Sequence, residues 1–117
     1  MHEYSIVSSL IDQAENAARR NGATGIASLT VRIGESSGVD ARLLGIAFET
    51  FREKTICAQA RLDIERVPSQ WSCPKCGAPP LPDGPLRCFA CNQPMQLVSG
   101  DEIVLAHLEL EVPDHVY

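Results

Sequence analysis

The sequence predicts an α+β fold of α/β-like connectivity, with two helices on a small mixed sheet and a four-cysteine lobe inserted between strands. Three observations lead to this prediction. Two segments carry apolar residues at helical spacing, three segments alternate apolar with polar residues, and two C-x-x-C steps interrupt the series of strands. With 117 residues the chain is long enough for one domain and a small appendage.

The first predicted helix runs from Tyr4 to Asn21. Its apolar residues recur at a spacing that puts them on one stripe, namely Val7, Leu10, Ile11, Ala14, Ala17 and Ala18. Arg19 and Arg20 suit the negative end of the helix dipole, and Asn21-Gly22 can supply a left-handed cap. The helix should therefore end at Asn21.

A strand, a helix and a second strand follow with short connections. Alternation predicts strands at 26–33 and 60–65, and Asp40 is a suitable N-cap for a helix that extends to about Lys54. The residues expected to face the core are Ala27, Leu29, Val31 and Ile33 in the first strand and Leu43, Leu44, Ala47, Phe48 and Phe51 in the helix. Such a unit forms parallel neighbouring strands under a right-handed crossover, so both helices can cover one face of the sheet.

The composition changes after Pro68, where prolines, glycines and cysteines replace the periodic pattern. A short returning strand is expected at 95–98, and a long final strand at 102–112 should rejoin the main sheet. The lobe is therefore an insertion. The predicted domains are a discontinuous α/β domain of residues 1–70 and 95–117, and a lobe of residues 71–94.

Four cysteines give the strongest chemical signal, and they form two C-x-x-C steps: Cys73, Cys76, Cys88 and Cys91. Each step folds into a tight knuckle, and two facing knuckles complete a tetrahedral, zinc-ribbon-like site with metal–sulfur distances of about 2.3 Å. The alternatives are two disulfides, which need an oxidising compartment, and a four-thiolate iron or iron–sulfur centre. Four thiolates leave no open position, so the pattern favours a closed structural zinc site.

Composition and charge argue against several classes of function. A net charge of −5 and a pI of 5.1 speak against nucleic-acid binding, which needs a basic face, and against binding to an anionic membrane surface. The acidic start of the chain lacks the basic region of a secretion signal, and no stretch is apolar for long enough to span a bilayer. A cytoplasmic protein with reduced thiols is therefore expected.

The chain begins with a second group of metal-binding atoms. The α-amine of Met1, the deprotonated backbone amide of His2 and an imidazole nitrogen of His2 can all reach one ion. The amide or carboxylate of Glu3 can fill a fourth position, and Met1 should be retained because His2 is too bulky for ready removal of the initiator. Square-planar nitrogen donors suit Ni(II) and Cu(II). From spacing alone, a solvated histidine near a terminus is the more ordinary interpretation.

Several features of the sequence occur together: the two C-x-x-C steps, Met1-His2-Glu3-Tyr4-Ser5-Ile6-Val7, Gly34-Glu35, Ala47-Phe48-Glu49 and the acid-rich strand through Ile64. With this combination, essentially the whole chain resembles the HypA/HybF family of hydrogenase-maturation nickel metallochaperones. The most specific part is the Met-His-Glu start joined to a late four-cysteine site.

The resemblance implies a nickel-binding α/β domain that holds Ni(II) at the N-terminus, and a zinc ion at the four cysteines. It implies delivery of nickel to the large subunit of [NiFe] hydrogenase with a maturation GTPase as partner, and in some members service to urease maturation. Some members carry histidines beside the cysteine knuckles. This chain departs from them, because Gly77 and Asn92 stand at those places.

Three classes of function compete. A metallochaperone without catalytic residues accounts for both metal motifs. A zinc-ribbon protein-interaction module accounts for the cysteines only, and a thiol oxidoreductase would use a single C-x-x-C pair. Three further residues have ordinary interpretations: His107 as a half-exposed residue on the strand face of Ile103 and Leu105, Cys57 as a small buried hydrophobe, and Trp71 as a contact between lobe and main domain.

Overall fold

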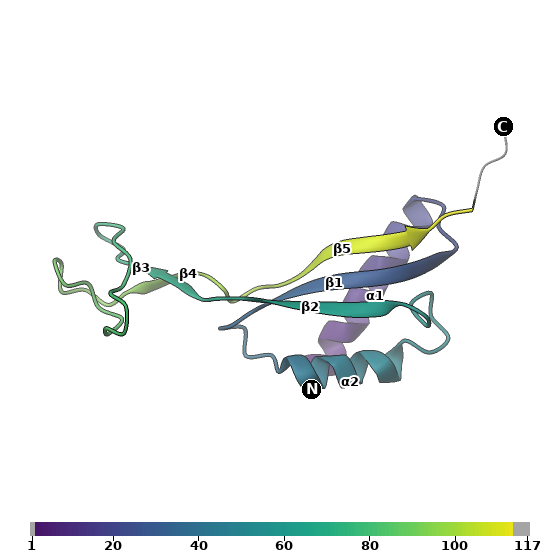
Figure 1. Cartoon of the computed structure of the whole chain (residues 1–117), viewed down its shortest axis with the longest axis horizontal. Helices are drawn as coiled ribbons and strands as arrows, with labels where there is room; N and C mark the ends of the chain where they lie inside the picture. The colour runs from purple at the N-terminus through teal and green to yellow at the C-terminus, as the bar shows by residue number, and fades with distance from the viewer. Residues whose placement is uncertain (1, 114–117) are drawn as a thin grey trace.

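Strand β1 (Gly25–Gly34) is the middle strand of the main sheet. The computed structural model describes residues 2–113, with side chains from residue 3 onward. Strand β2 (Arg61–Val67) pairs with β1 in parallel and β5 (Ile103–Glu111) pairs with it antiparallel, which gives the order β2-β1-β5 (Figure 1). The predicted mixed sheet, its parallel pair and the returning final strand are confirmed.

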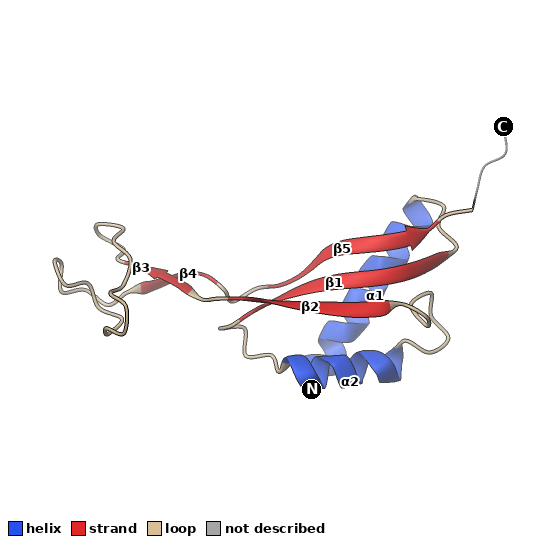
Figure 2. Cartoon of the chain, viewed as in Figure 1, coloured by secondary structure: helices blue, strands red, loops and turns tan. Residues whose placement is uncertain are grey.

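Two helices, α1 (His2–Arg20) and α2 (Ala41–Phe51), pack on one face of this sheet (Figure 2). Buried residues from both helices and β1 supply most of a single core, which consists of Val7, Leu10, Ile11, Ala14, Ala18, Ile26, Leu29, Val31, Ile33, Leu44, Ala47, Phe48, Cys57 and Ala60. The other face is charged, and Arg32 there pairs with Glu65 at 3.0 Å. One buried and one solvated face explain the alternation of the strands.

Helix α1 begins at His2 rather than at the predicted Tyr4. The negative charge of Glu3 in the first turn is stabilised by the positive end of the helix dipole. The Tyr4 ring packs edge-on against Phe51 of α2, with ring centroids 5.0 Å apart, and this contact holds the first turn against the second helix. None of the described helices is long and apolar enough to cross a membrane.

Helix α2 has the predicted start and a different end. The Asp40 carboxylate accepts hydrogen bonds from two amides of the first turn, which confirms it as the N-cap. The helix ends at Phe51 instead of Lys54, whose backbone is left-handed with φ of 64°. The expected burial of Leu43 and Phe51 is wrong, since they are 42% and 44% exposed. The helix buries a narrower stripe than its apolar residues suggest.

Two irregularities in the pairing of β1 with β5 change which side chains reach the core. A register shift between Ile26 and Ser28 buries Ile26 and leaves Ala27 exposed, contrary to the expectation for Ala27. A second shift leaves Ala106 without a partner in the ladder. Leu105 and Leu108 therefore both pack against the core, and His107 does not share the face of Leu105 as predicted but is exposed.

Strands β3 (Gln70–Ser72) and β4 (Gln96–Ser99) form a separate two-stranded sheet. The returning strand is thus shifted by one residue from its predicted start, and Trp71 pairs with Leu97 across the small sheet. The cysteine lobe lies beyond it, at the far end of a molecule that measures 63 × 36 × 19 Å (Figure 1).

Two chain segments, 68–69 and 100–102, connect the two sheets, and we call them the neck. The end of β1 and the turn after it are bonded to the neck, because the amide of Gly34 donates to the carbonyl of Glu102 at 2.8 Å and the amide of Ser36 to the carbonyl of Gly100 at 2.7 Å. A Cβ atom on Gly34 would lie 2.2 Å from that same carbonyl oxygen, so no larger residue fits there. The neck is therefore pinned to the main sheet by backbone contacts.

Candidate metal centre

Two knuckles closed by the same type of backbone hydrogen bond carry the four cysteines. In the first, the amide of Lys75 donates to the Sγ atom of Cys73 at 3.4 Å. In the second, the amide of Cys91 donates to the Sγ atom of Cys88, also at 3.4 Å. The residues after the second cysteine of each knuckle, Gly77 and Asn92, have left-handed φ angles of 75° and 53° and donate back to the carbonyl of the first cysteine. These two residues close the turns, as glycine and asparagine do most readily.

The knuckles bring the four Sγ atoms within 4.8 Å of one another. The distance between the Sγ atoms of Cys76 and Cys88 is 3.7 Å. A tetrahedron with metal–sulfur bonds of about 2.3 Å has edges of about 3.8 Å, so the spacing fits a four-thiolate metal site. Among the side chains that the structure describes, this is the one group of three or more potential metal ligands.

The protonation of these thiols follows from their hydrogen bonds. The pKa of Cys73 is lowered to about 7, chiefly because the backbone amide of Cys76 stabilises its thiolate. The pKa of Cys91 is raised to about 12, chiefly through its contact with the Cys76 thiol and further through burial. Without a cation, four sulfurs this close cannot all ionise, whereas a coordinated thiol is deprotonated outright. Metal binding must therefore release protons.

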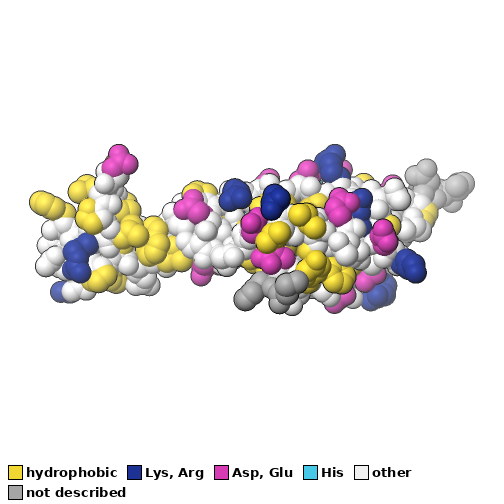
Figure 3. Space-filling model, turned by 90° about the horizontal axis from the view of Figure 1, so that it is seen from below, with side chains coloured by type: hydrophobic (Ala, Val, Ile, Leu, Met, Phe, Trp, Pro, Cys, Tyr) yellow, Lys and Arg dark blue, Asp and Glu magenta, His cyan; other side chains and the backbone are white. Residues whose placement is uncertain are grey.

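The side chains between the cysteines face away from the sulfurs. Phe89, in the middle of the second knuckle, is 92% exposed, and Leu81 and Leu86 are 60% and 47% exposed. Figure 3 shows hydrophobic side chains gathered over this end of the molecule. Sequence reasoning did not single out this surface, although the middle positions of a knuckle must point away from a metal that the flanking cysteines hold.

The other predicted site residues lie at the N-terminus. Met1 and the side chain of His2 are outside the described residues. The backbone of His2 opens α1, and Glu3 follows half-buried in the first turn. The first amides of a helix have no partner within the helix, so the amides of His2 and Glu3 are not used by its hydrogen-bond ladder. Their role as nickel ligands stays a prediction.

Comparison with known proteins identifies the family. A family model described as "Hydrogenase/urease nickel incorporation, metallochaperone, hypA" matches residues 1–110. The chain belongs to the HypA family. The match extends over the N-terminal Met-His-Glu segment and over both cysteine knuckles.

Individual HypA proteins are similar over nearly the whole chain. The hydrogenase maturation factor HypA of Wolinella succinogenes is 43% identical over 97% of this chain and 98% of its own length. That of Deinococcus radiodurans is 44% identical over 90% of this chain and 89% of its own. The solution structure of the Ni metallochaperone HypA from Helicobacter pylori superposes with a TM-score of 0.75 at 36% identity, covering 95% of this chain and 98% of that one. The α+β fold with a cysteine cluster is thus the HypA fold.

Proposed function

We propose that this chain is a nickel carrier that binds Ni(II) at its N-terminus and delivers it to the large subunit of [NiFe] hydrogenase during maturation. The observation that carries the proposal is the match of the nickel-incorporation family over residues 1–110, which includes both metal motifs. In this proposal the α-amine of Met1, the amide and imidazole of His2, and Glu3 hold the nickel. The ion is cargo in this proposal, and the chain acts as a carrier and not as an enzyme.

The proposed nickel site is suited to transfer. Nitrogen donors arranged in a plane leave the axial positions of Ni(II) open, so thiolates of an acceptor can bind before the donor releases the ion. The start of α1 supports such a site, because the first-turn amides can lose their protons without breaking a helical hydrogen bond. Binding displaces protons from the amine and amides, so nickel affinity should rise with pH.

The second metal in the proposal is structural zinc, held by Cys73, Cys76, Cys88 and Cys91. The donor set fits because the four sulfurs already approach tetrahedral spacing. Zinc would cross-link the two knuckles, which have little core of their own: Cys73 and Cys88 are the buried hydrophobic residues of the segment 71–94. We therefore divide the chain into a nickel-binding domain of residues 1–70 and 95–117 and a zinc lobe of residues 71–94.

The proposed partners are a hydrogenase-maturation GTPase and the hydrogenase large subunit, with urease maturation proteins as further candidates because the family description includes urease. We propose a cytoplasmic location, where the five cysteines, all of them free thiols, stay reduced.

A nickel titration tests the proposal. Isothermal calorimetry on the untagged protein should give one nickel site that is lost in His2→Ala and in a variant extended by Gly-Ser before Met1, while zinc content and circular dichroism stay unchanged. Both changes remove a nitrogen donor from the chelate and leave the cysteine lobe untouched. Undiminished nickel affinity in either variant would refute the assignment.

A zinc-ribbon interaction module without nickel transfer is the second candidate, and the exposure of Phe89 at the tip of the lobe favours it. The same titration separates the two. One zinc ion without N-terminal nickel supports the interaction module, and one zinc ion with nickel that depends on His2 supports the carrier.

A further inference from the structure

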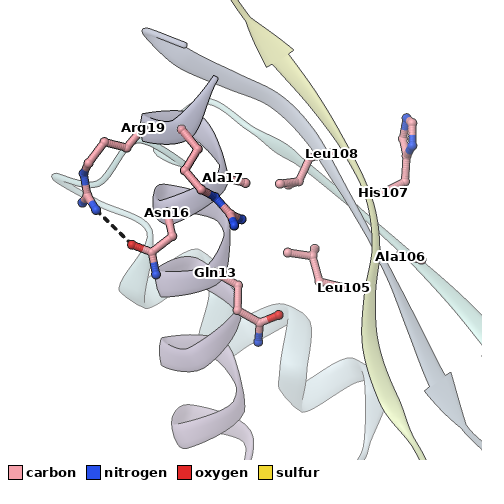
Figure 4. A pocket seen from close by; sticks show the side chains of 9 residues that line it. Gln13, Asn16, Ala17, Arg19, Leu105, Ala106, His107 and Leu108 are labelled. Atoms are coloured by element: carbon pink, nitrogen blue, oxygen red, sulfur yellow. Dashed lines mark hydrogen bonds between the residues drawn. The ribbon is translucent and has the colours of Figure 1, made fainter. Parts of the chain in front are cut away.

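Strand β5 is the last strand of the main sheet, and within the described chain one of its edges pairs with no other strand. A cavity of about 590 Å³ lies along that edge, between β5 and α1. Four consecutive residues, Leu105 to Leu108, line it, although neighbouring side chains of a strand point to opposite sides. Figure 4 shows Leu105 and Leu108 directed toward α1 and His107 directed away. The backbone edge itself therefore forms one wall.

The opposite wall is cationic and polar. It consists of Gln13, Asn16, Ala17, Arg19 and Arg20 of α1. The guanidinium of Arg19 donates to the side chain of Asn16 at 2.9 Å, on the side of α1 that is turned away from Leu105 and Leu108 (Figure 4). No carboxylate belongs to the described lining, although the chain as a whole has a net charge of −5. The local charge therefore favours an acidic ligand.

A second cavity of about 240 Å³ continues the first toward the N-terminus of α1. It is lined by Ser9, Leu10 and Ile103, reaches Ser5, and shares Gln13 with the first cavity. The two form one groove from Arg20 to Ser5, which we call the β5 groove. Its helix wall is about 22 Å long at 1.5 Å per residue. An extended segment of about seven residues spans that length. The groove ends three residues from His2.

We propose that the β5 groove binds an extended acidic segment of the nickel-accepting protein as an added strand on β5. Strand addition would use the free backbone edge, with apolar side chains against Leu105 and Leu108 and acidic side chains near the cationic end of the groove at Arg19 and Arg20. The other end of the segment then lies at Ser5, three residues along the sequence from His2. An acceptor bound in this way presents its metal ligands to the nickel, so this inference rests on the proposed function. From the sequence alone, the two arginines have only the role of complementing the helix dipole.

The experiment uses the full chain and the hydrogenase large-subunit precursor, with amide hydrogen exchange followed by mass spectrometry. We expect protection of the β5 amides in residues 105–108 on addition of the precursor. The double variant Arg19→Gln/Arg20→Gln should bind roughly tenfold more weakly and lose this protection, because both positive charges of the groove are removed. A matched control, Arg42→Gln/Arg66→Gln, changes the net charge equally at exposed arginines outside the groove and should bind like the unaltered chain.

The outcomes separate the two proposals. The nickel affinity that calorimetry measures should be the same in both double variants as in the unaltered chain. Absence of nickel binding in the unaltered chain would refute the proposed carrier function and not the groove proposal. Absent binding, protection confined to the zinc lobe, or equal effects of both double variants would overturn the groove proposal. So would β5 protection that appears on concentrating the chain alone, because a second copy would then occupy the edge.

Discussion

Asp40 is the N-cap of α2, and its side chain stabilises the start of this helix. Its Oδ1 atom accepts hydrogen bonds from the amides of Arg42 at 2.9 Å and Leu43 at 3.3 Å, two of the amides without a helical partner at the start of α2. Asp40→Ala should lower the free energy of unfolding by about 1 kcal/mol. Urea denaturation measures this change. Asp12→Ala, at an exposed position inside α1, is the control and should change stability by less than about 0.5 kcal/mol.

Cys57 should make stability depend on alkaline pH. It is fully buried, as predicted, and burial, with a smaller contribution from the charge of Glu15, raises the pKa of its thiol from 9.0 to about 11. The unfolded chain therefore loses the proton first, so this contribution to stability is complete below pH 9 and is lost as pH rises to about 11. The loss should approach about 2 kcal/mol.

Chemical denaturation at several pH values tests this expectation against Cys57→Ala. The variant should be less stable at pH 8, because it leaves a small cavity, yet its stability should fall less between pH 9 and pH 11. Tyrosines and lysines titrate in both proteins, so the difference between the two curves isolates the thiol. Parallel curves would show that Cys57 does not carry this pH dependence.

Residues whose role is set locally could be predicted from the sequence. The Asp40 cap needs only the next three residues, and the cysteine knuckles need only their own turns. The exposure of Leu43 and Phe51 could not be predicted, because it depends on how far the sheet extends under α2. Apolar character tells which side chains can be buried, whereas packing decides which ones are.

At the scale of the elements, the neck requires glycine at position 100. Gly100 has φ of 102°, and a Cβ atom there would lie 2.6 Å from the Cα atom of Ser69. Gly100→Ala should therefore destabilise the protein by at least about 2 kcal/mol, through both strain and a clash with backbone that cannot move aside. Thermal unfolding of the zinc-loaded protein measures the effect.

Gly45→Ala is the matched control for this change. Gly45 lies inside α2, and a Cβ atom there meets no other atom within 4 Å. The substitution should raise stability by about 0.5–1 kcal/mol, because alanine loses less backbone entropy than glycine in a helix. Equal effects of the two substitutions would show that the neck does not demand glycine.

The strands illustrate what periodicity can and cannot predict about an element. Alternation identified β1, β2 and β5, and the short connections through α2 predicted the parallel pairing of β1 with β2. The shifts at Ala27 and Ala106 left no signal, because a bulge inserts one residue without changing the local composition. The predicted face of His107 was wrong for that reason. The free edge of β5 and the β5 groove could not be predicted either, because they depend on how the strands and α1 pack together.

At the scale of the whole molecule, the proposed zinc lobe and the main domain should differ in their need for metal. Cys73→Ser/Cys88→Ser removes one ligand from each knuckle, so zinc should be lost and the lobe should unfold, while the core of α1, α2 and β1 remains intact. Amide NMR spectra should lose dispersed signals for residues 71–94 only.

Zinc retention should also depend on pH. The cluster needs four thiolates, so acid releases the metal as protons compete for sulfur.

For the double variant, Cys57→Ala serves as the control, because it removes a cysteine and should leave zinc content unchanged. Collapse of the whole spectrum in the double variant would show that the main domain needs the metal as well.

The neck makes this molecule more elongated than a compact protein with the same number of residues. A compact chain of 117 residues has a radius of gyration of about 13 Å, whereas this one has 18.9 Å. Because backbone contacts pin the neck, the separation of the two ends is set by the fold and not by a loose linker. A chain of this shape can touch two surfaces of one assembly at once, and attachment of either end raises the effective concentration of the other. Two weak contacts then act as one strong contact, and shortening the molecule at the neck would lose this avidity while leaving each end able to bind.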